Sequence, residues 1–411
     1  MMMNNLLKIM LLGSIFMLIS CALDNSKIMS YKPIVRNNTA VILIDFPDLP
    51  DSLKDKKISV EEAKELFLGD MVKNYFDTMS YGNLKLSGEC FGYFTMDDSL
   101  EEKDKNTDSI IKITENYNLK IKNHTEDYFD TVVFIIFHHD YVQQGISVAG
   151  FANFTMNGKK YEQRNVIYLG VSLADSISVR DNFEKLPHPC GMKYVQAIFV
   201  HEFIHQINGH RNIPHANSCT NDIFFDYQEP TKFQPPEFFD LEYGNGFDIM
   251  GVGKFSLSLN AGYRKLCGWL NKENSYVFTD KGEYDVTLFP INRRNVKTSV
   301  EIKLIDKEKT EEDFPAYFIE IREPDYWDAS LNSPHLIKNT KGLMVNKTDG
   351  FKTKLLCMNP TKNFIVDEDN FFVSYSDMCL KPGSKYENKE IKLWGVTSNA
   401  NGSFSFKIKI K

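Results

Sequence analysis

The chain has 411 residues, of which 42% are hydrophobic and 25% charged, fractions typical of globular rather than disordered proteins. This length exceeds what a single compact core usually fills, so we expect two domains. The formal net charge is −7, and no basic block interrupts the acidic balance. The composition therefore lacks the electrostatic footprint of a nucleic-acid-binding protein, and we expect no nucleic-acid partner.

The N-terminus has the layout of a signal peptide. Lys8 precedes an apolar run over residues 10–19, which is too short to cross a bilayer as a permanent helix. The run ends in Leu-Ile-Ser-Cys at 18–21, which resembles a bacterial lipobox, in which the cysteine is acylated and becomes the mature N-terminus. We expect a lipoprotein signal peptide at 1–20 and a lipid anchor on Cys21; an ordinary secretory signal is the alternative.

The sequence contains seven cysteines, an odd number for an exported protein. With Cys21 as the lipid anchor, six remain, and export places them in an oxidising compartment where up to three disulfides can form. We expect the pair Cys357–Cys379 first and Cys190–Cys219 next. The alternative is a set of buried thiols, which behave as small hydrophobic side chains.

Helices and strands are both predicted in the first part of the chain. Short β-branched and apolar runs indicate buried strands, and apolar residues at every third or fourth position indicate helices. The elements predicted in chain order are a strand at 41–44, a helix at 59–79, strands at 83–95, 131–137 and 166–169, and helices at 192–208 and 256–266. The mostly polar stretch 21–38 precedes them and is expected to be a tether.

The pattern changes after about residue 272, where apolar and polar residues tend to alternate with period two. The alternating runs lie at 284–288, 300–304, 317–321 and 404–408. Short alternating strands separated by turns suggest a β-sandwich. We therefore predict an α+β protein with a boundary near residue 275, which separates a domain at 39–275 from a β-rich domain at 276–411.

The most informative motif is His201-Glu202-Phe203-Ile204-His205, which matches the HExxH pattern. Residues four apart share one face of a helix, so His201 and His205 project two imidazoles toward one point, suitable for Zn²⁺. Glu202 is placed to take a proton from a water at the metal. This helix is apolar nearly all round, which predicts burial, and buried polar side chains need partners that a metal supplies. The alternative is a pair of histidines satisfied by hydrogen bonds in the core.

A second motif follows downstream, where Met250 lies between glycines in the segment 246–251 (GFDIMG). Such a methionine alone would be a core or turn residue. Together with the upstream HExxH, it resembles the Met-turn that packs beneath the metal in metzincins. A Met-turn argues against a thermolysin-like distal ligand such as Glu229 or Glu242.

Several separated segments resemble, in the right order, the immune inhibitor A family of bacterial metallopeptidases. They are 41–48 (VILIDFPD), 75–92 (YFDTMSYGNLKLSGECFG), the HExxH helix, 247–270 (FDIMGVGKFSLSLNAGYRKLCGWL), 316–324 (AYFIEIREP) and 342–349 (GLMVNKTD). The resemblance covers about residues 40–350. It implies a zinc endopeptidase acting outside the cell, with a metzincin-like catalytic domain followed by a β-rich domain. It also implies that His201 and His205 bind zinc, that Glu202 is the general base and that Met250 is the Met-turn residue.

The third metal ligand is where the sequence departs from this family. The family has glycine three residues after the second histidine and then an acidic residue after Leu-Pro, whereas here Asn208 takes the glycine position and Gly209 follows. Residues 213–215 (Ile-Pro-His) would replace the apolar-Pro-acid triplet if residues were inserted, which makes His215 the ligand, and imidazole is a good zinc ligand. The strict metzincin count ends one residue past His210. We favour His215 and keep His210 as the alternative.

Two further groups of residues are candidates for metal binding. His138-His139-Asp140 ends a predicted strand and could bind metal, although a strand end near the cleft is the favoured interpretation. Asp45 and Asp48 could contribute oxygen ligands to a structural Ca²⁺ site, with a simple turn as the favoured interpretation.

These patterns together predict an exported zinc endopeptidase, anchored to the bacterial cell envelope through the lipid on Cys21, that hydrolyses extracellular proteins or peptides. In this scheme Zn²⁺ polarises the peptide carbonyl, Glu202 activates the water, and the proton passes to the leaving amine. We expect no folded pro-domain in the short stretch between Cys21 and Val41. Two alternatives are a surface-binding lipoprotein that retains the fold without catalysis and a zinc amidase acting on cell-wall peptide.

Overall fold

The computed structural model describes residues 35–49, 51–54, 57–97, 118–119, 129–138, 146–148, 152–163, 165–172, 192–207, 213–219, 240–241, 245–251, 258–304, 316–332, 341–349, 352–356, 358, 366–367, 372–373 and 378–411. The expected signal peptide and Cys21 lie outside these residues. The described chain forms several sheets and few helices, which confirms the mixed α+β class. None of its helices has the length and apolar character needed to traverse a membrane.

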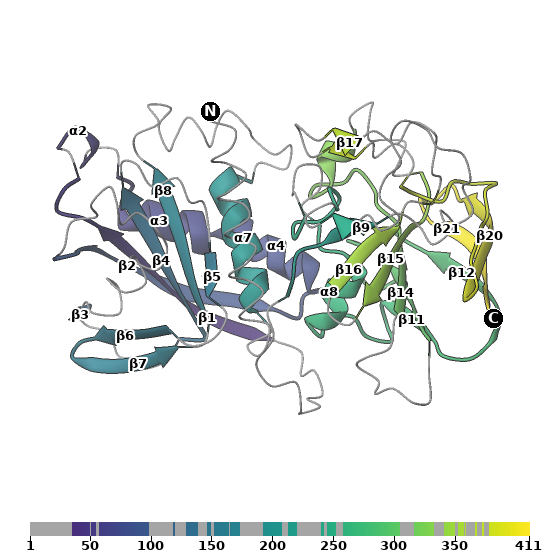
Figure 1. Ribbon diagram of the computed structural model, residues 1–411, viewed down its shortest axis with the longest axis horizontal. Helices are drawn as coiled ribbons and strands as arrows, with labels where there is room; N and C mark the ends of the chain where they lie inside the picture. The colour runs from purple at the N-terminus through teal and green to yellow at the C-terminus, as the bar shows by residue number, and fades with distance from the viewer. Residues whose placement is uncertain are drawn as a thin grey trace.

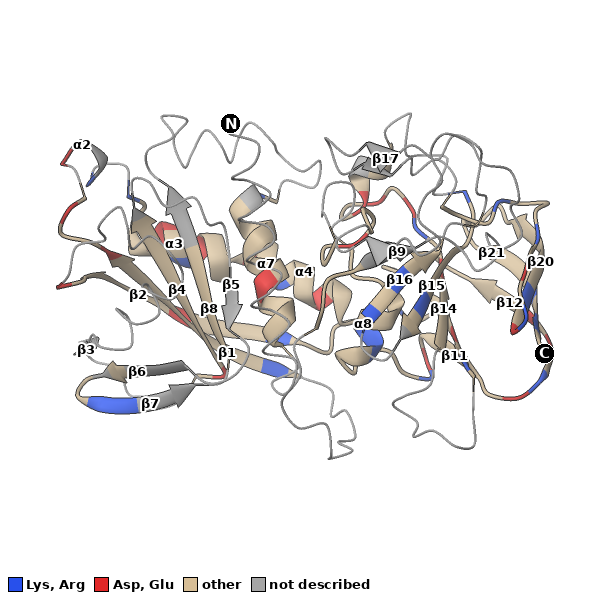
Figure 2. Cartoon of the chain, in the orientation of Figure 1, with Lys and Arg blue, Asp and Glu red and all other residues tan. Residues whose placement is uncertain are grey.

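A five-stranded sheet in the order β2-β1-β4-β8-β5 lies in the left half of Figure 1. Its strands are β1 (Arg36–Asp45), β2 (Lys85–Thr95), β4 (Thr131–His138), β5 (Ile146–Val148) and β8 (Val166–Ser172). The pairs β1–β2, β1–β4 and β4–β8 are parallel, whereas β5 pairs antiparallel with β8 at one edge. All four strands predicted in this part of the chain belong to the sheet. The central strand β4 has no Asp, Glu, Lys or Arg (Figure 2), as expected for a strand buried on both faces.

Three helices pack on one face of this sheet, namely α3 (Val60–Leu68), α4 (Asp70–Met79) and α7 (Tyr194–Gln206). Phe67 of α3, Phe76 of α4 and Phe203 of α7 share a core with alternate residues of β1 and β4. The single helix predicted at 59–79 is wrong in one respect, because the structure divides it at Gly69. This glycine has extended dihedral angles and is both the C-cap of α3 and the N-cap of α4.

Two further sheets lie in the right half of Figure 1: a seven-stranded sheet in the order β10-β9-β16-β15-β14-β13-β11 and a four-stranded sheet in the order β12-β21-β20-β19. The strands of the larger sheet are β9 (Asn217–Cys219), β10 (Asp240–Leu241), β11 (Ser275–Phe278), β13 (Ser299–Lys303), β14 (Ala316–Glu320), β15 (Met344–Asp349) and β16 (Lys352–Leu356). Those of the smaller sheet are β12 (Gly282–Leu288), β19 (Tyr386–Glu387), β20 (Ile391–Ser398) and β21 (Phe404–Ile410). Alternate side chains of both sheets meet in one apolar core, as the period-two pattern predicts.

The larger sheet, called here the C-terminal sheet, also takes in chain that precedes residue 275. The strands β9 and β10 come from before that position and pair within the sheet. Helix α8 (Ala261–Leu266) contacts β14. It is shorter than the helix predicted at 256–266, because the Asn260 side chain caps its first turn by accepting from the Tyr263 N–H. The remaining short elements are α2 (Asp51–Lys54), β3 (Asn118–Leu119), β6 (Ala152–Met156), β7 (Lys159–Gln163), η4 (Ala329–Asn332), β17 (Val366–Asp367) and β18 (Phe372–Val373).

The two expected disulfides stay predictions, because each includes a cysteine outside the described residues. Cys357 and Cys190 are not described, and neither is the side chain of Cys219, so the pairs Cys357–Cys379 and Cys190–Cys219 cannot be compared with the structure. Cys90 and Cys267 form no disulfide, and Cys267 is buried in the apolar core, which fits the alternative of a buried thiol for that residue.

Candidate metal centre

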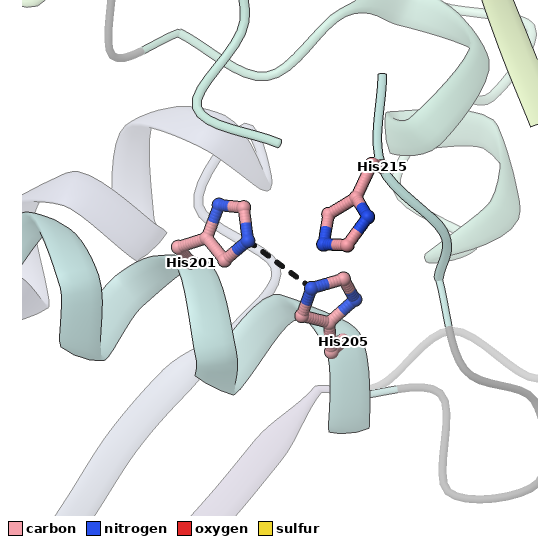
Figure 3. Close-up of side chains that lie close together, drawn as sticks. All are labelled: His201, His205 and His215. Atoms are coloured by element: carbon pink, nitrogen blue, oxygen red, sulfur yellow. Dashed lines mark hydrogen bonds between the residues drawn. The ribbon is translucent and has the colours of Figure 1, made fainter. Parts of the chain in front are cut away.

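Three histidine side chains converge between α7 and the segment that leads into β9. His201 and His205 lie one turn apart on α7, and their Nε2 atoms are 3.1 Å from each other (Figure 3). His215 faces them from across the site, with its ring centroid 4.8 Å from that of His205 and 5.5 Å from that of His201. One nitrogen from each ring lies within 4.8 Å of the other two, so the described residues offer a three-histidine group that could hold a metal ion.

The orientations of the two α7 imidazoles are set by backbone carbonyl groups. The Nδ1 atom of His201 lies 2.7 Å from the carbonyl oxygen of Ile249, and the Nδ1 atom of His205 makes a short contact with the carbonyl oxygen of Ile213. A carbonyl only accepts hydrogen bonds, so each Nδ1 carries the proton and donates. Both Nε2 atoms then present lone pairs to each other across 3.1 Å. Two such acceptors repel unless a cation lies between them, which fits a metal ion.

His215 is fixed through its own backbone and that of its neighbour. The Tyr263 hydroxyl of α8 donates to the His215 carbonyl oxygen at 2.8 Å, and the N–H of Ala216 donates to the carbonyl oxygen of Met250 at 2.8 Å. Only about 5% of the His215 surface is exposed. At the other end of the segment, the Ile213 N–H donates back to the His205 carbonyl oxygen at 3.1 Å, which ties the end of α7 to the third histidine.

His215, the residue favoured as third ligand, lies in the same group as His201 and His205. The alternative His210 lies outside the described residues, and so do Glu229 and Glu242. His215 could be nominated from the sequence, but its position depends on hydrogen bonds from α8 and from the turn at Met250, which are remote in sequence.

The predicted Met-turn residue lies in a buried turn that contacts both histidine-bearing segments. Met250 is fully buried and shares the core of α7 and the five-stranded sheet. Its carbonyl oxygen accepts from the Ala216 N–H, and the preceding carbonyl, that of Ile249, accepts from His201. The turn is closed by Asp248, whose Oδ1 accepts from the Met250 N–H at 2.7 Å.

Asp248 is a site residue for which sequence reasoning assigned no role. Its carboxylate is fully buried, and its second oxygen, Oδ2, accepts from the Asn260 N–H at 2.6 Å. Burial raises the pKa of Asp248 to about 6, although the Arg322 guanidinium and the two backbone N–H groups favour the ionised form. Its position two residues before Met250 was the only signal available. The carbonyl groups of Ile213 and Ile249 could not have been found, because any residue supplies one.

Glu202 is the single acidic residue of α7 and follows His201 directly. It is buried, with about 9% of its surface exposed. The rest of α7 packs through Phe199, Phe203 and Ile204 into the core shared with the five-stranded sheet.

The weaker metal candidates gain no support from the described residues. Asp45, at the end of β1, is held by the Lys57 ammonium group, whose Nζ lies 2.5 Å from Oδ2. The metal-binding group found in the described chain does not include Asp45 or Asp48. His138 ends β4, and His139 and Asp140 lie outside the described residues.

No protein-family model matches the chain, and a search of curated proteins returns no match. The functional assignment therefore depends on the residues of the site and on their geometry. These residues are two imidazoles held one helical turn apart, a third imidazole opposite them, and a buried glutamate that follows the first histidine in the chain.

Proposed function

We propose that this chain is a zinc-dependent endopeptidase in which His201, His205 and His215 bind the metal and Glu202 is the general base. The observation that carries the proposal is the convergence of three histidine nitrogens within 4.8 Å, with Glu202 adjacent to the first. Three neutral imidazoles suit Zn²⁺, and three protein ligands leave a fourth position open, as in catalytic rather than structural zinc sites.

In the proposed reaction, the metal and the residues of the chain have separate roles. Zinc supplies Lewis acidity when bound, which makes a water more acidic and polarises a carbonyl group. Glu202 accepts the proton of the attacking water and delivers it to the leaving amine of the cleaved bond. The backbone carbonyls of Ile249 and Ile213 hold His201 and His205 in the tautomer that turns Nε2 toward the site.

A peptide substrate is supported by the sheet edge beside α7. The strand β5 pairs with β8 on one side only among the described strands and also contacts α7. In this proposal an extended peptide adds to β5 as a further strand through main-chain hydrogen bonds. Such binding recognises the main chain of the substrate rather than its side chains. It suits an enzyme that cleaves within unfolded or extended chains.

The family and location belong to the same proposal. The buried Met250 turn beneath two ligand-bearing segments, together with α7 packed on a mixed sheet, supports a metzincin-like catalytic domain of the immune inhibitor A type. The pairing of the C-terminal and four-stranded sheets around one core supports a β-sandwich-like second part. Export and a lipid anchor on Cys21 follow from the lipobox-like sequence.

The test is cleavage of an unfolded protein by the zinc-loaded chain and by Glu202→Gln. We expect the wild type to cleave, and the variant to bind zinc equally while its rate falls by about 10²–10⁴-fold, the usual contribution of a general base. Glu283→Gln, which changes an exposed carboxylate of β12, is the matched control and should cleave like the wild type. Stoichiometric zinc without cleavage by either protein would favour the surface-binding alternative. Release of cell-wall peptide alone would favour an amidase.

A further inference from the structure

The third histidine leads directly into the C-terminal sheet. Strand β9 begins two residues after His215 and pairs parallel with β16, with Asn217 opposite Lys354 and Ser218 opposite Leu355. The β16 strand is itself paired with β15 in the middle of the sheet. The chain that follows His215 therefore enters a sheet whose strands, apart from β9 and its neighbour β10, all begin at residue 275 or later.

Helix α8 provides a second connection between His215 and this sheet. Tyr263 of α8 donates from its hydroxyl to the His215 carbonyl oxygen at 2.8 Å, and the same hydroxyl accepts from the Thr353 N–H of β16 at 3.4 Å. The helix lies close against the sheet at Gly262, where an added Cβ would come within 2.6 Å of the Thr353 Cγ2 atom. Tyr263 is thus held between the third histidine and β16.

A third connection runs to the turn that orients His201. Asp248 in this turn accepts from the Asn260 N–H, and the next N–H, that of Ala261, donates to Glu320 Oε2 of β14 at 2.7 Å. The other oxygen of Glu320 accepts from the Arg322 guanidinium at 2.7 Å. Glu320 and Arg322 are both buried, with at most 1% of their surfaces exposed.

The ion pair of Glu320 and Arg322 gives this connection a fixed geometry. Arg322 also donates to the Ser258 carbonyl oxygen at 3.3 Å and lies 3.5 Å from a carboxylate oxygen of Asp328. Buried charges are tolerated only when such partners satisfy them. The Glu320 and Arg322 side chains are therefore held in one position relative to each other. The segment 258–261, between the Met250 turn and α8, is therefore clamped to the C-terminal sheet through side chains of defined position.

We propose that the C-terminal sheet is a positioning element of the metal centre rather than a separate module. It holds His215 through β9, β16 and Tyr263, and it holds the turn that accepts from His201 through Glu320, Ala261 and Asp248. This inference rests on the proposed function, since it takes the three histidines to bind a metal. Tyr263 and Glu320 are positioning residues that touch neither metal nor substrate.

The experiment compares two pairs of variants in the full chain. Tyr263→Phe removes the hydroxyl that contacts His215, and Tyr81→Phe removes a hydroxyl that bonds to Ile291 and Thr298 of the C-terminal region without leading to the histidines. Glu320→Gln breaks the clamp on α8, and Glu301→Gln breaks the ion pair of another buried glutamate with Lys265 of the same helix. The readouts are Co²⁺ and Zn²⁺ affinity, the visible spectrum of bound Co²⁺, and the melting temperature of the metal-free protein.

Tyr263→Phe and Glu320→Gln are expected to weaken metal binding by about 10–100-fold and to change the Co²⁺ spectrum, as loss of an outer-shell partner does. The two controls should bind like the wild type even where their melting temperatures fall. Wild-type affinity and spectrum in Tyr263→Phe and Glu320→Gln would overturn the inference while leaving the metal site intact. If the wild-type protein itself bound no metal, that result would contradict the proposed function.

A folding defect is separated from a positioning defect by the metal-free melting temperature. If Glu320→Gln does not fold, Arg322→Lys serves in its place, because lysine keeps the buried positive charge but lacks the fork that joins Glu320 to the Ser258 carbonyl. Folded Arg322→Lys with weakened Co²⁺ binding and an altered spectrum would support the inference. Unchanged binding in a folded Arg322→Lys would contradict it.

Discussion

His201 donates a hydrogen bond from Nδ1 to the carbonyl oxygen of Ile249, which lies 48 residues further along the chain and 2.7 Å away. The next carbonyl, that of Met250, accepts from Ala216, the residue that follows His215. One buried turn therefore orients two histidine-bearing segments that are remote in sequence. Outer-shell partners of this kind fix the tautomer and direction of a histidine ligand, so metal affinity should respond to changes in this turn.

Replacing His215 with alanine is expected to lower zinc affinity by at least the ~10–100-fold that loss of an outer-shell partner costs, because a ligand itself is removed. Equilibrium dialysis against zinc measures the change. His210→Ala is the matched control, since it removes a nearby histidine of the same sequence segment. If His210→Ala lost the metal and His215→Ala kept it, His210 would be the ligand and the geometry described here would be contradicted.

Zinc should stabilise the folded protein, because its ligands come together only when α7 and the segment before β9 are in place. At a free zinc concentration ~100 times the dissociation constant, the gain is about 2.7 kcal/mol. Urea unfolding of metal-free and zinc-loaded protein measures the gain. A His201→Ala/His205→Ala double variant should show none, and equal stabilisation of the double variant would place the zinc elsewhere.

Asp248 should make stability depend on pH in a defined direction. Burial raises its folded-state pKa from 3.8 to about 6, so the folded protein holds this proton more tightly than the unfolded chain does. The contribution of this proton to the free energy of unfolding is therefore full below about pH 4, declines as the pH rises, and is lost above about pH 6. The shift corresponds to about 3 kcal/mol.

The measurement is the free energy of unfolding of the metal-free protein from pH 4 to pH 7, for the wild type and Asp248→Asn. The free energy of unfolding of the wild type, relative to that of Asp248→Asn, should fall as the pH rises and level off above about pH 6. Asp285→Asn, an exposed carboxylate of β12, is the control. A difference that rises with pH would mean that the folded state stabilises the Asp248 carboxylate rather than its acid form.

Gly262→Ala should loosen the contact between α8 and β16. The added Cβ would lie 2.6 Å from the Thr353 Cγ2 atom and 3.1 Å from the Asn260 Oδ1 atom, so the helix must move away from the sheet. We expect a loss of about 1–3 kcal/mol in unfolding free energy, the usual cost of overpacking. In Gly282→Ala the added Cβ would come no closer than 3.3 Å to its nearest neighbour, the Tyr284 hydroxyl, and this variant is the control. Equal stability of both variants would show that α8 does not pack tightly there.

Local patterns were sufficient to predict several elements of this fold. The β-branched run at 131–137 became β4, because a continuous apolar strand is stable only when both faces are buried. His201 and His205 were predicted to share one face of a helix, and they do, since that relation follows from helical period alone.

Features that depend on remote contacts could not be read from the sequence. The helix predicted at 256–266 is shortened to α8, because the Asn260 N–H donates to Asp248 while the Asn260 side chain accepts from the Tyr263 N–H and caps the helix. Strands β9 and β10 pair within the C-terminal sheet although they precede residue 275, and no local pattern specifies that pairing. The carbonyl partners of His201 and His205 have no sequence signal at all.

The most direct test of the zinc assignment is X-ray absorption at the zinc edge of the full chain loaded with one equivalent of zinc. We predict a shell of nitrogen and oxygen neighbours at ~2.0–2.1 Å, with the outer-shell scattering of three imidazole rings. The signal of one ring should disappear in His215→Ala. Sulfur neighbours at ~2.3 Å, or the absence of imidazole scattering, would contradict binding by His201, His205 and His215.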